Sequence, residues 1–162
     1  MNKPILFFVG MVLALNSMGQ QVAPTEPAAT VAPTVTEPKV AVTLGVFNGG
    51  GGLVGADFEF MLTERVSLQL GAGLPSFGAG INYHLKPGIR SSMINLGYWH
   101  QGIGETYTQS LLGPSYVFRA RKLFTAQIGL GYLLEEGPAW PTDKEHPSTM
   151  LLYSIGIYLP VK

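Results

Sequence analysis

The chain has 162 residues, a formal net charge of zero and no cysteine, and only 12% of its residues are charged. This length fits one domain, and the charge balance argues against nucleic acid or a strongly charged partner. The lack of cysteine excludes disulfides, thiolate metal sites and a thiol nucleophile.

Residues 1–19 have the pattern of a secretory signal peptide. Lys3 is followed by an apolar run from Ile5 to Leu15 and by Ser17-Met18-Gly19, with small residues at the two positions that a signal peptidase examines, and we expect cleavage after Gly19. The run of about eleven residues is shorter than the roughly 20 that a transmembrane helix needs. Residues 20–38 are rich in proline, threonine and alanine and predict a disordered spacer. The spacer is either a disordered tail without a specific role or a tether that reaches toward the cell wall or a partner.

From residue 39 to residue 160, large apolar residues alternate with glycine and small polar residues, as in Val66-Ser67-Leu68-Gln69-Leu70. A period of two predicts strands with one apolar face and one small, polar face. Eight strands are expected, at residues 40–47, 54–63, 66–74, 77–85, 91–99, 107–118, 124–134 and 150–159.

The connections between these strands alternate in length. Short turns are expected at 64–65, 86–88 and 120–122, and longer loops at 48–52, 100–106 and 135–149. A two-residue turn at Pro75-Ser76 would pair Leu74 with Phe77, Gln69 with Asn82 and Ser67 with His84. The glycine-rich 48–52 segment lacks the lysine and the helix of a phosphate-binding loop, so we expect a flexible hairpin tip there.

The composition of the two faces indicates whether the apolar face meets lipid or a protein core. A soluble protein normally carries lysine and glutamate on its wet face, whereas here that face is largely glycine, serine, asparagine and glutamine. Small polar side chains suit the narrow lumen of an eight-stranded barrel. The fold class is therefore predicted to be all-β, an eight-stranded antiparallel up-and-down transmembrane β-barrel with its apolar face in lipid. A soluble periplasmic lipocalin-like barrel is the alternative.

In signal peptide, strand count, alternating faces and loop asymmetry, the chain resembles the small eight-stranded outer-membrane barrels of the OmpA-like, OmpX-like and OmpW-like group. The resemblance implies residence in the outer membrane, with contact to its lipid and to the barrel-assembly machinery. Two features depart from the group. The chain ends Leu159-Pro160-Val161-Lys162 rather than in an aromatic residue, and Pro114 falls within a strand, where a bulge at Gly113-Pro114 or a displaced strand boundary is expected.

The polar face carries a candidate cluster of charged and amide side chains. Asp57 and Glu59 share this face, and parity places His84, Lys86 and Arg119 inward as possible partners. Paired carboxylates can act in acid/base catalysis, but in a filled barrel a structural role is favoured. The predicted lumen cluster is Asp57, Glu59, Gln69, Asn82 and His84.

No catalytic, metal or cofactor site is predicted. The spacing of His84, His100 and His146 matches no common metal motif. Lipid A deacylases of similar architecture use a serine–histidine pair with an acidic residue on the outer face, and His100 has no serine at the spacing typical of them. In the last loop, Trp140 between prolines is a candidate for contacting an extracellular ligand, or an anchor to the barrel rim.

The sequence thus favours a non-enzymatic outer-membrane protein with an envelope-structural or surface-interaction role. The alternatives are a narrow pore for small solutes, a lipid-modifying enzyme and the soluble lipocalin-like barrel.

Overall fold

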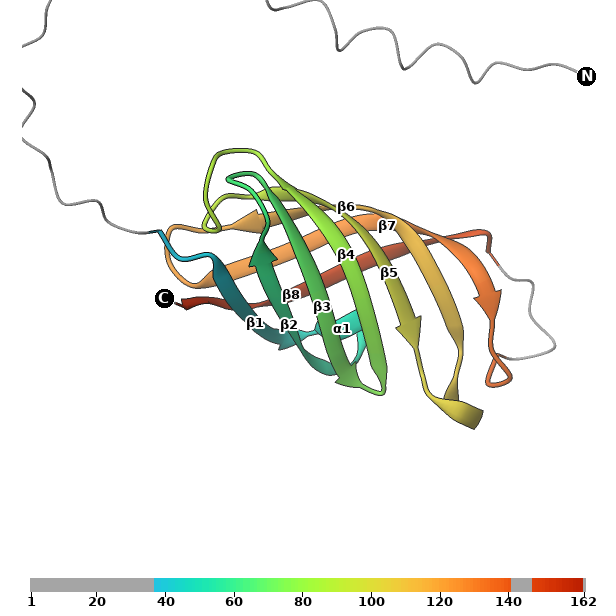
Figure 1. Cartoon of the computed structure of the whole chain (residues 1–162). Coiled ribbons are helices and arrows are strands. Elements are labelled where there is room, and N and C mark those ends of the chain that lie inside the picture. Colours follow the sequence, from blue (N-terminus) through green and yellow to red (C-terminus); the bar gives the residue numbers. More distant parts are fainter. Residues whose placement is uncertain (1–36, 141–146, 162) are drawn as a thin grey trace, which may run out of the picture. The chain divides into compact units, whose positions relative to one another are not determined.

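A computed structural model describes residues 37–140 and 147–161 of the chain. The predicted signal peptide, nearly all of the predicted spacer, and His146 lie outside the described residues. The described part is all-β and forms one closed antiparallel barrel in which each strand pairs with the next and β1 pairs with β8 (Figure 1). The strands are β1 Val40–Val46, β2 Val54–Met61, β3 Val66–Leu74, β4 Ser76–His84, β5 Met93–Gln101, β6 Gln109–Arg119, β7 Phe124–Glu136 and β8 Thr149–Val161.

The barrel has two rims, which we name by the segments they carry. The proximal rim carries residues 37–39, the turns at 62–65, 85–92 and 120–123, and the end of β8. The distal rim carries the connections at 47–53, 74–75 and 102–108, and residues 137–140 and 147–148 between β7 and β8. One short turn of helix, α1 Asn48–Gly51, follows β1, and a short 3-10 turn, η1 Gly104–Thr106, follows β5. Within residues 37–140 and 147–161, no helix is long and apolar enough to cross a membrane.

The structure confirms the eight predicted strands and the assignment of residues to two faces. Large apolar residues of every strand point outward and stay exposed, among them Phe58, Leu70 and Ile81. The residues between them point inward and are buried, including Asn82, Asn95 and Ser154. The protein is therefore apolar on its outside and largely polar in its interior.

The predicted pairing of β3 with β4 is wrong by two residues. Gly73 pairs with Ser76, so Leu74 and Pro75 form the turn, joined by a cis peptide bond. Gln69 consequently faces Gly80 rather than Asn82, and Ser67 faces Asn82 rather than His84. Because the shift is by an even number of residues, every side chain keeps its predicted face.

Pro114 produces neither a bulge at Gly113-Pro114 nor a strand boundary. β6 runs through it, and Pro114 pairs with Leu96 of β5. The ladder with β7 skips residues 113 and 114 and then resumes in the same register. Since proline has no backbone N–H, a gap in one ladder is the expected local cost. The register shift of this strand pair lies instead between Ser110 and Leu111.

The glycine-rich connection after β1 is not a flexible tip, which corrects the sequence prediction. After Val46 the chain turns at Phe47, whose φ is 60°, and α1 enters the barrel, where Asn48, Gly49 and Gly50 are buried. Its backbone packs on inward-facing glycines: a Cβ on Gly71 would lie 2.8 Å from the Cα of Gly49, and one on Gly78 would lie 3.0 Å from the Cα of Gly50. The glycines that line β3 and β4 therefore leave room for α1, which fills the distal lumen.

Candidate functional site

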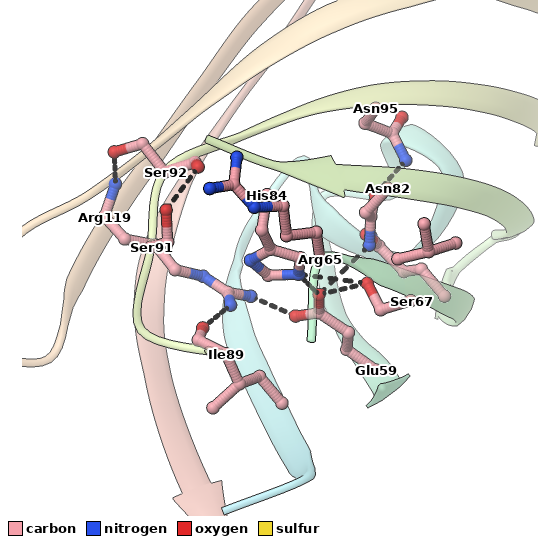
Figure 2. Close-up of polar contacts among 12 residues, drawn as sticks. Glu59, Arg65, Ser67, Asn82, His84, Ile89, Ser91, Ser92, Asn95 and Arg119 are labelled. Atoms are coloured by element: carbon pink, nitrogen blue, oxygen red, sulfur yellow. Dashed lines mark hydrogen bonds and ion pairs between the residues drawn. The ribbon is translucent and has the colours of Figure 1, made fainter. Parts of the chain in front are cut away.

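Glu59 is the centre of the polar contacts in the proximal half of the lumen (Figure 2). Its Oε1 accepts hydrogen bonds from the Ser67 hydroxyl at 2.5 Å and the Asn82 amide at 3.2 Å, and it lies 2.8 Å from Nε2 of His84. Its Oε2 forms a salt bridge with the guanidinium of Arg119. Glu59, Asn82, His84 and Arg119 are all buried. A carboxylate so enclosed by donors is a structural anchor for several strands.

Arg119 connects this anchor to the closure of the proximal rim. One guanidinium nitrogen donates to the carbonyl of Ile89, whose side chain is buried against Ala41 and Met61. The guanidinium carbon also lies 4.8 Å from the ring centroid of buried Tyr158. The turn between β4 and β5 is thereby drawn across the end of the barrel, and the lumen is closed at this rim.

Asp57 does not share cation partners with Glu59, although the two are on one face as predicted. Its carboxylate accepts from the Asn48 amide at 2.8 Å and from the Gly49 backbone N–H at 3.2 Å. The Ser76 hydroxyl donates to the Gly49 carbonyl at 2.6 Å. Asp57 therefore fixes α1 inside the lumen. Lys86, expected to point inward, lies beyond the end of β4 and is exposed.

A belt of amide and hydroxyl groups continues around the barrel from Asn82. Gln69 accepts from Asn82 at 3.2 Å, and Asn95 donates to Asn82 at 2.6 Å. Further links join Asn95 to Ser115, Ser115 to Gln127 and Gln127 to Ser154. Two cavities between the lumen side chains have a volume of about 10 Å³ each, room for about one water molecule. The structure thus brings Glu59, Gln69, Asn82 and His84 into one network and places Asp57 in a neighbouring one.

The distal lumen opposite α1 is apolar, which the sequence did not indicate. Trp99, Leu111 and Leu152 are buried there against Leu133 and Met150. These residues come from β5, β6, β7 and β8 and share the inward face with the amides. These apolar residues differ from the amide belt in lying nearer the distal rim.

A stacked cluster lies on the outer surface at the distal rim. The His100 ring stacks between Phe77, at 4.4 Å, and Tyr107, at 4.3 Å between ring centroids. Nδ1 of His100 lies 3.0 Å from the Ser110 hydroxyl, which also contacts the hydroxyls of Tyr98 at 3.0 Å and Tyr107 at 2.8 Å. Desolvation raises the pKa of Tyr107 more than its hydrogen bond with Ser110 lowers it, and the nearby Glu135 adds to the increase.

Sequence reasoning missed this serine–histidine pair because it considered only residues close to His100 in the chain. The pair forms across the β5–β6 hairpin, where His100 lies directly opposite Ser110. Ser110 is only 1% exposed, and its hydroxyl is enclosed by two tyrosines and the imidazole. This enclosure is typical of a packing role rather than of an accessible nucleophile.

Trp140 begins the part of the last loop for which the structure gives no description. It is half-buried, and its backbone N–H donates to the Gly137 carbonyl at 3.1 Å. Its role in contacting a ligand stays a prediction. Among the described residues, no group of three or more histidine, aspartate or glutamate side chains could hold a metal ion.

Comparison with known proteins gives no match to any family model, curated protein or solved structure.

Proposed function

We propose that this chain is an integral outer-membrane barrel protein with an envelope-structural or surface-interaction role and no enzymatic activity. The observation that carries the proposal is the belt of large apolar residues that surrounds the closed barrel, with exposed side chains on every strand. Soluble monomers rarely expose a contiguous apolar patch of more than a few hundred Å². Lipid is the solvent that such an exterior fits.

The strand lengths agree with this proposal. β3, β4 and β5 have nine residues each. At about 3.3 Å per residue and a tilt of about 35–45°, nine residues rise about 21–24 Å, close to the apolar band of about 25 Å in outer-membrane barrels. With the proximal rim in the periplasm, the distal rim faces the cell exterior, where interaction with a partner would take place.

The filled lumen supports a non-transport role over a narrow pore. α1 occupies the distal half, the Arg119–Ile89 contact closes the proximal rim, and the cavities between them have room for about one water molecule each. Conduction needs a continuous wet path. We therefore expect the refolded protein to show no single-channel conductance in planar bilayers, and steady openings would contradict this part of the proposal.

A charge-scanning experiment tests membrane residence. Leu70 is the central residue of β3, points outward and is 64% exposed. In a membrane, Leu70→Arg should cost about 2–4 kcal/mol of folding free energy, whereas Leu85→Arg, next to the proximal rim, should cost about 0–1 kcal/mol. In a soluble barrel neither change should matter. Equal stabilities in urea titrations, with refolding in the absence of detergent, would overturn the membrane assignment.

The proposed lack of enzymatic activity is tested at the serine–histidine pair. The distance of 3.0 Å between Ser110 and His100 is the observation that favours a lipid-modifying enzyme. The 1% exposure of Ser110 opposes it. We expect no labelling of Ser110 by a fluorophosphonate probe and no release of acyl chains from outer-membrane lipid. Labelling that is lost in His100→Ala would instead support the enzyme.

A further inference from the structure

The barrel wall is incomplete between β1 and β8 at the distal rim. β1 ends at Val46, which pairs with Ile155 of β8, and the chain then turns inward at Phe47 to form α1. β8 continues to Thr149 in pairing with β7. Within the described residues, the stretch Thr149–Ser154 therefore has no strand partner on its β1 side. Withdrawal of α1 into the lumen leaves a side opening here.

A cavity of about 300 Å³ lies at the distal mouth beside this opening. Its lining includes Trp99 and Gln101, which point into the barrel from β5, and Leu151 and Tyr153, which belong to the outward face of β8. A cavity that contacts residues of both faces crosses the wall. It therefore joins the distal mouth of the lumen to the outer apolar belt.

The lining has an apolar part and an uncharged polar part. Phe47, Leu151 and Tyr153 lie on the side of the opening, where Phe47 packs edge-on against Tyr153 at 5.0 Å, and Leu53 lines the cavity from the connection between α1 and β2. Gln101, Thr106 and Thr108 supply amide and hydroxyl groups on the side of the β5–β6 connection. The described residues that line the cavity include no charged side chain.

We propose that this cavity binds a single-chain amphiphile with an uncharged polar head. The chain would enter from the belt between β1 and β8 and contact Trp99. The head would accept from the amide nitrogen of Gln101, whose oxygen already accepts from Gln109, and donate to the hydroxyl oxygen of Thr108, which itself donates to the Gln101 carbonyl. The volume is at the lower end of the range for small-molecule sites, about 300–1,000 Å³, which favours one acyl chain over a diacyl lipid. A charged head would lose its hydration without gaining an ionic partner. The inference rests on the proposed membrane location, because the belt must face lipid.

Trp99 provides a direct reporter. The chain has two tryptophans, so Trp140→Phe leaves Trp99 alone. Trp99 is 7% exposed and points away from the belt, so bromine dissolved in the surrounding membrane should hardly quench it. Bromine on a chain inside the cavity should quench it strongly.

The experiment uses the full-length Trp140→Phe protein in phosphatidylcholine vesicles, with 11-bromoundecanol as the neutral probe. We expect saturable quenching of Trp99, reversal by monolauroylglycerol, and at least tenfold weaker quenching by the anionic 11-bromoundecanoate. Leu151→Gln should weaken the neutral probe several-fold. Leu130→Gln is the matched control, because Leu130 pairs with Leu151, is similarly exposed, and lies on β7 outside the cavity lining.

Heat-modifiable gel migration of each protein comes first and separates the two proposals. Failure of the Trp140→Phe protein to insert as a heat-modifiable barrel would refute the membrane proposal itself. If the protein inserts, three results would each overturn the binding inference while the membrane proposal stands. These are quenching that rises linearly with probe concentration, equal quenching by the two probes, and equal quenching in Leu151→Gln and Leu130→Gln. A misfolded Leu151→Gln is replaced by Gln101→Leu, for which binding of the neutral probe should likewise weaken and unchanged binding would overturn the inference.

Discussion

Gly71→Ala tests the packing of α1 in the lumen, because two opposite effects are expected from one methyl group. Alanine is ordinarily the better strand residue, by about 0.5–1 kcal/mol. Here, however, the new Cβ would lie 2.8 Å from the Cα of Gly49 and would also collide with the Asp57 carboxylate. The direction of the stability change therefore reports whether α1 occupies the lumen.

The magnitude follows from the contacts that must give way. Moving α1 would disturb the two hydrogen bonds that Asp57 accepts from Asn48 and Gly49. A hydrogen bond contributes about 0.5–1.5 kcal/mol net, and overpacking alone costs about 1–3 kcal/mol. Allowing for partial relaxation and for the strand preference of alanine, we expect the free energy of unfolding to fall by about 2–5 kcal/mol.

The assay is urea unfolding of the refolded barrel in detergent micelles, with the heat-modifiable folded band measured at each concentration. Ala72→Val is the matched control, because the neighbouring residue points outward and should change stability by no more than about 0.5 kcal/mol. If Gly71→Ala is as stable as the parent protein or more so, α1 does not fill the lumen, and the explanation of the inward glycines fails.

Three further predictions concern the other contacts. Glu59→Gln and Arg119→Met should each lower the free energy of unfolding by about 3–5 kcal/mol, because each leaves a buried charge unpaired. The double variant should lose clearly less than the sum of the two, and losses in urea unfolding that simply add would contradict the pairing. Tyr107→Phe keeps the ring against His100 but removes the hydroxyl bonded to Ser110, so thermal unfolding should show a loss of about 1 kcal/mol and Tyr107→Ala a larger one. The pKa of Tyr107 is raised in the folded state. Its contribution to stability is therefore complete below the unfolded pKa of about 10 and is lost as pH rises through the folded pKa. Ultraviolet difference titration should show that Tyr107 ionises at a higher pH than free tyrosine, and ionisation at a lower pH would contradict this prediction. Asp57→Ala should release α1 locally, seen as faster hydrogen exchange in residues 47–53 with β6 unchanged; no change there would indicate that Asp57 does not hold α1.

The strands and their faces could be predicted from the sequence because the protein meets a different solvent on each face. Residues such as Leu68 and Gln69 alternate regularly, and a period of two needs no knowledge of distant contacts. Pairing depends also on the geometry of each turn. At Leu74–Pro75 the turn lies one residue earlier than expected, and this moved every β3–β4 pair while preserving parity.

The function of the glycines could not be predicted from single strands. Gly71 and Gly78 are inward-facing small residues in any barrel, but they are small here because Gly49 and Gly50 pack against them from a separate segment. Likewise Glu59 meets Arg119, sixty positions away, only after the barrel closes. A search for an unusually glycine-rich connection opposite glycine-rich inward positions would have indicated the first contact.

The position of α1 in the chain has a consequence for the order of assembly. α1 directly follows β1 and contacts β2, β3 and β4, which come next in the sequence, more than it contacts β5 and β8. The seam between β1 and β8 joins the two ends of the barrel sequence and can form only when the last strand is present. Most contacts of α1 can therefore form while the sheet is still an open curved ribbon, and closure of the seam adds its contacts with β8.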